Sequence, residues 1–403
     1  MSEEFYRIKR LPPYVIAEVN AMRAAARAAG EDIIDLGMGN PDLPPPPHVI
    51  AKLCEVASKP DAHGYSASKG IPGLRKAQAG YYARRFGVDL DPESEVVVTL
   101  GSKEGLANLA QAITAPGDVI LAPNPSYPIH TFGFIIAGAT IRSVPTTPDE
   151  HYFEALERAM KFTVPKPSVL VMGYPSNPTA EVVDLAFYER VVAFAKQHGL
   201  WVLSDLAYSE LYFDGCPTPS ILQVPGAKDV AVEFTSVSKT YSMAGWRIGF
   251  AVGNKTLIGA LTRVKSYLDY GAFTPIQAAA VAAINGPQDI VENNRRLYQK
   301  RRDVLVESFG RAGWDIPSPR ASMFAWAPLP PALAHLGSLE FSKQLLTHAG
   351  VAVAAGVGYG EEGEGFVRIA MVENEQRLRQ AARNVKKYLV SMGVNTPGQA
   401  NGV

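Results

Sequence analysis

Between residues 95 and 253 the sequence alternates short, β-rich apolar runs with stretches of helical periodicity. The runs are EVVVTL at 95–100, DVILA at 118–122, SVLVMG at 168–173, LWVLSD at 200–205, VAVEF at 230–234 and IGFAVG at 248–253. Several are apolar on both faces, as strands covered by helices on each side must be. We therefore predict an α/β fold with a mostly parallel central sheet and helices on both faces. The last two runs lie too close together for a helical crossover, so we expect one antiparallel strand.

A long amphipathic helix is predicted at about 287–309. Its apolar residues Ile290, Leu297, Val304 and Phe309 fall near one face, and arginine and lysine crowd the other. A helix of this length would connect two domains.

Three strands and two helices are predicted after this helix, and they indicate a smaller α+β domain. The strands lie at 322–329, 351–356 and 366–372, and the helices near 338–348 and 374–391. We expect an N-terminal arm with one helix (15–29) that packs with the small domain, then a large domain, a small domain and a tail. Their predicted bounds are 1–45, 46–285, 286–395 and 396–403.

Composition argues against several classes of function. Lys+Arg and Asp+Glu number 39 each, so the formal net charge is zero and nothing favours a nucleic-acid partner. The two cysteines, Cys54 and Cys216, have no disulfide or zinc spacing, and the seven histidines form no metal-spaced pair. We see no secretory signal and no apolar stretch long enough to span a membrane. We expect a cytoplasmic enzyme that acts on small molecules, without a metal and without a membrane partner.

Two short patterns resemble phosphate-binding loops but lack the required context. GYGEEG at 358–363 fits G-x-G-x-x-G, yet acidic residues fill it and a strand-like run follows where a helix is required. SKT at 238–240 matches the end of a Walker A loop, but the preceding glycines are missing. We therefore predict neither a dinucleotide site nor a P-loop, and we interpret the histidines as surface or packing residues.

Polar residues gather at the carboxyl ends of predicted strands, where open α/β sheets bind their ligands. One strand leads into Asp205 and Tyr208, a second into Asn177 and a third into Tyr127. At GSK (101–103) a helix begins directly after a strand, and its free N–H groups favour an anion. Taken singly, the aspartate could cap a helix, the asparagine could shape a turn and the serine could be an N-cap.

Lys239 lies in SVSKTYSMAGWR (236–247), just after the apolar run at 230–234. Taken alone, a lysine at this place is most simply a solvated loop residue. The strand-end residues change that interpretation, because together they supply a partner for every polar group of pyridoxal 5′-phosphate (PLP). An anion nest suits its phosphate, a carboxylate its ring nitrogen, a phenol or amide its ring oxygen, and an amine its aldehyde. We therefore predict PLP as the cofactor.

The chain resembles the fold-type I PLP-dependent aminotransferases of the class I and II (aspartate aminotransferase) family over nearly its whole length. The resemblance rests on S-x-S-K-x₇-R at 236–247, N-P-T at 177–179 and D-x-x-Y at 205–208. Stretches such as HGYSASKGIPGLR, GSKEGLANL and NPSYPIHTFG are most similar to the bacterial alanine (glutamate–pyruvate) aminotransferases.

This resemblance implies roles for the residues around the cofactor ring. Lys239 would form the Schiff base with the aldehyde and act as the catalytic base. Asp205 would bind the pyridine nitrogen, Tyr208 and Asn177 the 3′-oxygen, and Tyr127 would stack on the ring. We expect cationic neighbours to lower the pKa of Lys239.

The resemblance also implies a phosphate site and a homodimer. The residues that would surround the phosphate are Ser102, Lys103, Ser236, Ser238 and Arg247. Tyr65 would reach the phosphate in the neighbouring subunit of a homodimer.

Substrate contacts follow from the same resemblance. Arg368 would grip the substrate α-carboxylate, with Asn177 and the backbone of Gly39 beside it, and Tyr14 on the arm could close over the pocket. The loop reads N-P-T-A where N-P-T-G is commoner, and because alanine disfavours a positive φ we expect the turn at Ala180 to differ slightly.

The implied reaction is L-alanine plus 2-oxoglutarate giving pyruvate plus L-glutamate, in two ping-pong halves through pyridoxamine phosphate. The ammonium of Lys103 could meet glutamate's distal carboxylate, although Lys103 turned to solvent is an equal alternative. Aspartate and LL-diaminopimelate aminotransferases are close alternatives. A PLP-dependent lyase or racemase would use the same cofactor residues. A PLP-sensing DNA-binding regulator is disfavoured, since no basic or helix-turn-helix segment precedes residue 15.

Overall fold

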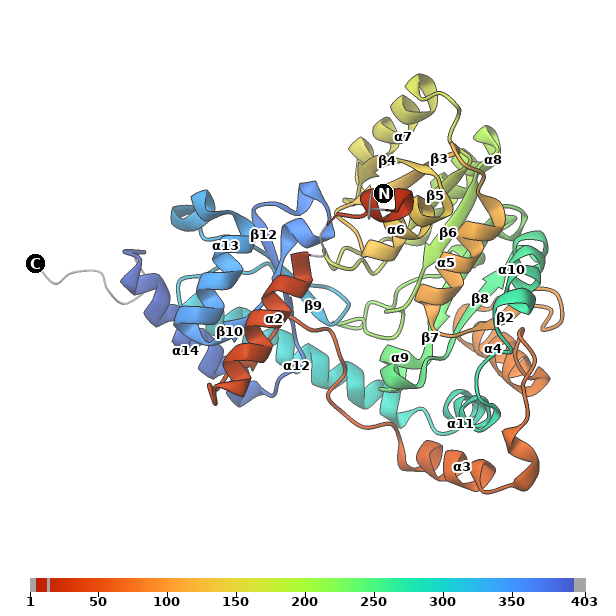
Figure 1. Ribbon diagram of the computed structural model, residues 1–403, viewed down its shortest axis with the longest axis horizontal. Helices are drawn as coiled ribbons and strands as arrows, with labels where there is room; N and C mark the ends of the chain where they lie inside the picture. Colours follow the sequence, from red (N-terminus) through yellow and green to blue (C-terminus); the bar gives the residue numbers. More distant parts are fainter. Residues whose placement is uncertain (1–4, 13–14, 395–403) are drawn as a thin grey trace, which may run out of the picture.

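The computed structural model describes residues 5–12 and 15–394 of the 403-residue chain. Figure 1 shows a larger lobe built on one sheet, a smaller lobe beside it, and a long helix that passes between them. In the part of the chain that the structure describes, no helix is both long and apolar enough to cross a membrane. Tyr14 lies outside the described residues.

The central sheet has seven strands in the order β2-β8-β7-β6-β5-β3-β4. The strands are β2 (Val96–Thr99), β3 (Val119–Asn124), β4 (Thr140–Pro145), β5 (Val169–Met172), β6 (Trp201–Asp205), β7 (Ala231–Ser236) and β8 (Gly249–Gly253). Strand β8 runs antiparallel to both of its neighbours, and every other neighbouring pair is parallel. The predicted α/β fold with one antiparallel strand is confirmed.

Strand β4 is one that the sequence analysis missed. It forms the edge of the sheet, and only Val144 among its six residues is buried. An exposed edge strand needs no apolar run, so its sequence, TIRSVP, carries no alternation that would reveal it.

Helices cover both faces of this sheet (Figure 1). On one face lie α5 (Ser102–Ile113), α6 (Pro128–Ala137) and α10 (Lys255–Leu268). The helices on the other face are α3 (Pro47–Ala57), α4 (Pro72–Phe86), α7 (Glu150–Phe162), α8 (Leu185–His198) and α11 (Thr274–Asn285). Within β2, Val97 packs on the first face and Val96 and Val98 pack on the second. Burial of both faces explains why these strands read as unbroken apolar runs.

The smaller lobe joins an antiparallel sheet to two helices and to the N-terminal segment. Its elements are β9 (Phe324–Pro328), β10 (Val351–Ala352), β11 (Ala354–Ala355), β12 (Phe366–Ala370), α13 (Gly337–Gln344) and α14 (Glu375–Ser391). Preceding them in the chain are α2 (Val15–Ala28) and β1 (Ile34–Asp35), whereas α1 (Tyr6–Lys9) lies beside the larger lobe near α6 (Figure 1), where Arg10 Nη2 donates to the Ala139 carbonyl at 2.6 Å. The single strand predicted at 351–356 is wrong: β10 pairs with β1, whereas β11 pairs with β12 in a different sheet. Apolar residues on both sides of the break conceal it in the sequence.

A long helix, α12 (Asp289–Arg311), lies where one was predicted, at about 287–309, but two of its arginines differ from the expected pattern. Arg301 and Arg302 are buried although arginine was expected on the solvent face. Each is held by a carboxylate from another segment: Arg301 Nη2 lies 2.6 Å from Asp42, and Arg302 Nη2 donates to Asp214 Oδ1 at 2.9 Å. Pairing makes the burial of these charges tolerable.

Separate hydrophobic clusters fill the two lobes. Val291 near the start of α12 belongs to the cluster under the central sheet, whereas Tyr298 and Val304 belong to the cluster of the smaller lobe. Ile34 and Leu36 of the N-terminal segment also pack in the smaller lobe. The predicted domain boundaries at 45 and 285 stay predictions, which this division of the core supports. The boundary at 395 and the tail at 396–403 lie outside the described residues.

Candidate active site

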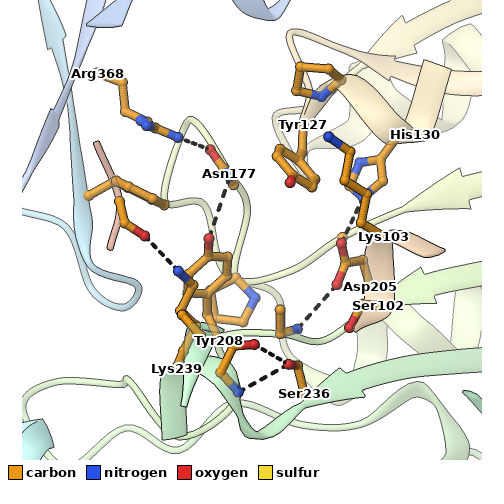
Figure 2. Close-up of a pocket in the computed structure, with 18 of the residues that line it drawn as sticks. Ser102, Lys103, Tyr127, His130, Asn177, Asp205, Tyr208, Ser236, Lys239 and Arg368 are labelled. Carbon is orange, nitrogen blue, oxygen red and sulfur yellow. Dashed lines mark hydrogen bonds and ion pairs between the residues drawn. The ribbon is translucent and has the colours of Figure 1, made fainter. Parts of the chain in front are cut away.

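A cavity of about 270 Å³ opens at the carboxyl ends of the parallel strands, between the two lobes. Twelve of the residues expected at the site line it: Gly39, Ser102, Lys103, Tyr127, Asn177, Asp205, Tyr208, Ser236, Ser238, Lys239, Arg247 and Arg368. Figure 2 shows Arg368, Asn177 and Tyr208 on one side and His130 and Asp205 on the other. Tyr65 is absent from the lining, and Tyr14 is not among the described residues.

Lys239 is presented by a single helical turn, α9 (Val237–Thr240), directly after β7. The hydroxyl of Ser236 caps this turn by accepting from the Ser238 N–H at 3.1 Å. Lys239 Nζ donates to the Gly39 carbonyl at 2.6 Å, across the pocket. Burial, together with the positive charges of Arg368 and Arg247, lowers the pKa of Lys239 from 10.5 to about 8. The expected direction is confirmed, but loss of solvation is a larger cause than the cations.

Asp205 ends β6 and meets a residue that the sequence analysis passed over. His130 Nε2 lies 2.9 Å from Asp205 Oδ2, and His130 is buried. The interpretation of every histidine as a surface or packing residue is therefore wrong for His130. It lies on α6, three residues after Tyr127, and that spacing from a strand-end aromatic residue was the available signal. Asp205 Oδ1 also accepts the Ala207 N–H at 3.3 Å.

Arg368, Asn177 and Tyr208 form a chain of side-chain contacts (Figure 2). Arg368 Nη1 donates to Asn177 Oδ1 at 2.8 Å, and Asn177 Nδ2 lies 3.5 Å from the Tyr208 hydroxyl. Arg368 Nη2 donates to the Gly37 carbonyl at 2.9 Å. The guanidinium is buried and lies 3.9 Å from the Phe324 ring centroid, so its orientation is fixed.

Gly39 is required by the same packing. A Cβ atom at this position would overlap the ring of Phe324, which lies under Arg368. The absence of a side chain lets the backbone of Gly39 approach both Phe324 and Lys239.

The loop that carries Asn177 corrects the expectation for Ala180. Ala180 adopts φ 58°, the left-handed region, although alanine disfavours it by about 1–2 kcal/mol. Two backbone hydrogen bonds close the loop: Ala180 N–H donates to Ser176 O at 3.0 Å, and Ser176 N–H donates to Glu181 O at 2.9 Å. The turn therefore keeps the conformation that glycine would favour.

The start of α5 forms a cradle for an anion. Gly101 precedes it with φ 86° and offers no capping side chain, and Ser102 and Lys103, the first two residues of the helix, line the pocket. A Cβ at Gly101 would overlap the Arg247 guanidinium, so the glycine also admits this positive charge. The Ser236 and Ser238 hydroxyls, 2.8 Å apart, lie at the end of β7 and in α9. We name this set, with Gly101 as its turn, the phosphate nest.

The donor and acceptor set fits PLP. Its phosphate is a dianion, and the phosphate nest combines an uncapped helix start, Arg247 and two hydroxyls. A carboxylate (Asp205), a phenol (Tyr208) and an amine of lowered pKa (Lys239) line the same cavity. Each polar group of the cofactor has a partner of the right charge and hydrogen-bonding type.

Tyr65 lies on the surface in this single chain, with 88% of its area exposed. Its ring stacks on Tyr270 at a centroid distance of 4.5 Å. Tyr267 and Leu268 beside it are also exposed, by 84% and 58%. These four side chains form an exposed aromatic patch, which is the name we use below. Patches of this kind mark interaction surfaces.

Comparison with known proteins gives one consistent result. The family model described as aminotransferase class I and II matches residues 31–385. The putative aminotransferase AatC of Rhizobium meliloti is 65% identical over 389 residues, which are 96% of either chain. The glutamate-pyruvate aminotransferase AlaC of Escherichia coli is 55% identical and covers 97% of this chain and 95% of its own.

More distant matches extend the same likeness. An LL-diaminopimelate aminotransferase of Moorella thermoacetica is 43% identical over 96% of this chain and 98% of its own. A substrate-bound structure of BacF from Bacillus subtilis superposes with a TM-score of 0.89 at 34% identity, covering 96% of this chain and 98% of that one.

Proposed function

This chain belongs to the class I and II aminotransferases, and from that premise we propose that it transfers the amino group of L-alanine to 2-oxoglutarate, giving pyruvate and L-glutamate. Enzymes of this family use PLP. When bound, PLP supplies an aldehyde that takes up the amino group and a ring that withdraws electrons from the substrate Cα. The likeness to AlaC at 55% identity supports the choice of substrates.

The observation that carries the proposal is the convergence of Lys239, Asp205 and Arg368 on one cavity. Lys239 would hold the aldehyde carbon, and Asp205 would keep the ring nitrogen protonated, with His130 fixing the carboxylate at 2.9 Å. Asn177 and Tyr208 would bind the ring oxygen, Tyr127 would stack on the ring, and the phosphate nest would hold the phosphate.

Arg368 would bind the substrate carboxylate. Its guanidinium offers two parallel donors, and its contacts with Asn177 and the Gly37 carbonyl hold that fork in one plane. A carboxylate held at two points leaves the substrate Cα–H bond in one orientation. Phe324 beneath the guanidinium prevents it from tilting.

Lys239 would carry the proton. Its pKa of about 8 leaves part of the side chain unprotonated near neutral pH, so Nζ accepts a proton from the substrate Cα. The same Nζ would then return this proton at the carbon that carries the aldehyde of the cofactor, and Lys239 would regain its free amine. Both transfers use a single base, which the position of Nζ within the cavity supports.

Lys103 is the residue that we propose for the distal carboxylate of glutamate. Its Nζ lies 5.9 Å from the Tyr127 ring centroid, and the residue lines the cavity. An ammonium at the rim would favour a dicarboxylic partner without excluding the small side chain of alanine. Use of the Lys103 backbone N–H alone is the competing arrangement, and Lys103→Ala separates the two by its effect on KM for 2-oxoglutarate.

The homodimer is part of the same proposal. The exposed aromatic patch would lie against a second copy and bring Tyr65 to the partner's phosphate site. Exposure of 88% for Tyr65 and 62% for Tyr270 supports an interface there, because large aromatic side chains seldom remain in water. Sedimentation of Tyr65→Ala and Tyr270→Ala variants tests it. The proposed cytoplasmic location rests on sequence composition alone.

A panel of amino donors tests the substrate assignment. We expect kcat/KM with 2-oxoglutarate as acceptor to be highest for L-alanine, and lower for L-aspartate and LL-diaminopimelate. The LL-diaminopimelate alternative has support from relatives at about 40% identity. A higher kcat/KM for either competitor would replace alanine as the donor while leaving the aminotransferase assignment intact.

A further inference from the structure

Lys265 is a fully buried lysine that the proposed mechanism does not use. It lies in α10 with none of its surface exposed. Its Nζ donates to Glu104 Oε1 and to Asp269 Oδ2, each at 2.9 Å. A buried ammonium is costly unless it is paired, so one cation held between two carboxylates is a built arrangement.

We propose that Lys265 is a positioning residue for the cofactor, which neutralises Glu104 beneath the phosphate nest and thereby sets the affinity of the nest for the PLP phosphate. This inference rests on the proposed function. It assigns to α10, a helix outside the cavity, an electrostatic role at the cofactor site.

Glu104 is part of the turn from which the phosphate nest is built. It lies in the first turn of α5, two residues after Ser102. Its Oε2 accepts the Leu100 N–H at 2.8 Å, and Oε1 accepts from the side chain of Asn108. The Glu104 carboxylate therefore connects the first turn of α5 to the residue before the helix, and these two hydrogen bonds fix the carboxylate relative to the phosphate nest.

A carboxylate at this position is electrostatically unfavourable for a phosphate. Two negative groups within one helical turn repel each other, and water screens the Glu104 side chain only in part, because 22% of its surface is exposed. Lys265 supplies the compensating charge at 2.9 Å without competing for the phosphate itself, because its ammonium lies behind the turn and not in the cavity lining.

Asp269 holds the other side of the ammonium. Its Oδ1 accepts the Gly271 N–H at 2.7 Å, and its backbone carbonyl accepts from the Ser68 hydroxyl at 2.5 Å. Tyr270, the next residue, stacks on Tyr65. Lys265 thus connects the turn of the phosphate nest to the loop of the exposed aromatic patch, and the Asp269 contact keeps it from moving away from Glu104.

Charge changes on the two partners should act in opposite directions. Lys265→Met keeps the length of the side chain and leaves Glu104 uncompensated, so the affinity for PLP falls. Glu104→Gln keeps an acceptor for the Leu100 N–H and removes one negative charge near the nest, while Lys265 stays paired with Asp269, so the affinity rises. The double variant removes both charges and should bind nearly as wild type does. A purely structural role would instead weaken binding in all three.

The test is the dissociation constant of PLP for the full chain, measured by cofactor absorbance after dialysis, with inorganic phosphate as a competitor. We expect Lys265→Met to raise Kd about tenfold, Glu104→Gln to lower it, and the double variant to lie within about threefold of wild type. The competing phosphate should show the same order. Lys255→Met, which removes an exposed lysine from the same helix, is the matched control and should leave Kd unchanged.

The outcomes separate this inference from the proposed function. Failure of the wild-type chain to bind PLP would overturn the proposed function. Suppose that the wild-type chain binds PLP. An unchanged Kd in Lys265→Met, or a higher Kd in Glu104→Gln, would then overturn the role of Lys265 alone. Should Lys265→Met fail to fold, Glu104→Gln still tests the proposal: a lower Kd for PLP supports the role of Lys265, and a higher Kd overturns it.

Discussion

The two halves of the pocket are built in different ways. On the large-lobe side, Asp205 and Ser236 end neighbouring strands of one sheet, so the register of that sheet sets their separation. On the other side, Arg368 comes from β12, Gly37 from the N-terminal segment and Phe324 from β9. This second half exists only where two hydrophobic clusters meet. Its geometry therefore depends on how the lobes pack, and not on one sheet.

Lys239 lies at the junction of these halves. It is carried by the end of β7, yet its Nζ donates to Gly39 O in the N-terminal segment. Its pKa responds to Arg247 on one side and to Arg368 on the other. Cofactor binding should therefore depend mainly on the sheet, substrate binding mainly on the smaller lobe, and proton transfer on both.

The largest effect is expected from Lys239→Ala. Loss of the only proposed base should lower kcat by at least about 10²–10⁴-fold, the range for general base catalysis. Steady-state transamination measures it. Lys255→Ala, on the exposed side of α10, should retain wild-type kcat. A Lys239→Ala enzyme with more than a tenth of wild-type turnover would show that Lys239 is not the base.

Arg368→Gln should separate the two halves. Truncation of a buried, hydrogen-bonded charge costs about 2–5 kcal/mol, so kcat/KM for L-alanine should fall by roughly 10²-fold or more. The Kd of PLP should change by less than about threefold, since its proposed contacts lie in the other half. Arg368→Lys keeps the charge but loses the planar fork, so its kcat/KM for L-alanine should lie between those of the wild type and Arg368→Gln. If Arg368→Gln weakened PLP binding by a larger factor than it lowered kcat/KM, the assignment of cofactor and substrate binding to separate halves of the pocket would be contradicted.

The pH dependence of folding tests the environment of Lys239. Its pKa is lowered from 10.5 to about 8 in the folded chain. Between these values the unfolded chain binds more protons, so the free energy of unfolding of the cofactor-free protein should increase with pH, by about 3 kcal/mol at most. Denaturant unfolding from pH 7 to about 9.5 measures this increase, below the range in which buried tyrosines of raised pKa oppose it.

Two variants serve as controls for this pH effect. In Lys239→Met the increase should be absent, because the titrating group is gone. In Arg368→Gln it should begin at a higher pH, because one of the cations that lower the pKa has been removed. An unchanged profile in Lys239→Met would assign the increase to another group.

The smallest effect is expected at Ala180. Replacement by glycine relieves a left-handed φ of 58°, and should raise the free energy of unfolding by up to about 1 kcal/mol. Thermal denaturation measures it, with Ala137→Gly, at the end of α6, as a control that should lose stability. A destabilised Ala180→Gly would mean that the Cβ of Ala180 contributes packing that outweighs the backbone strain.

Much of the fold was predictable because burial on both faces leaves a strong signal. Strands β2, β3, β5, β6, β7 and β8 read as apolar runs, and the polar residues that end them identified one half of the pocket. Edge strand β4 left no such signal, since solvent covers it. The break within 351–356 was hidden because both of its halves are buried, in different sheets.

The errors at single residues have a common cause. The three-residue spacing from Tyr127 places His130 near the strand end, but only the folded chain shows that its partner is Asp205. Ala180 was judged by the preference of alanine, whereas the hydrogen bonds of its loop decide its conformation. Arg301 belongs to the face of α12 that arginine and lysine crowd, and nothing in the sequence indicated its burial because its partner Asp42 is 259 residues away in the chain. Contacts between residues so far apart in the chain cannot be read from the local sequence pattern.

The central claim is that the cavity moves an amino group from one small molecule to another. The most direct measurement incubates the holoenzyme with ¹⁵N-labelled L-alanine and unlabelled 2-oxoglutarate and follows the label by mass spectrometry. We predict that ¹⁵N appears in L-glutamate in equal amount to the pyruvate formed, and that Lys239→Ala forms neither. Pyruvate with the label released as ammonia, or no labelled glutamate at all, would contradict the account.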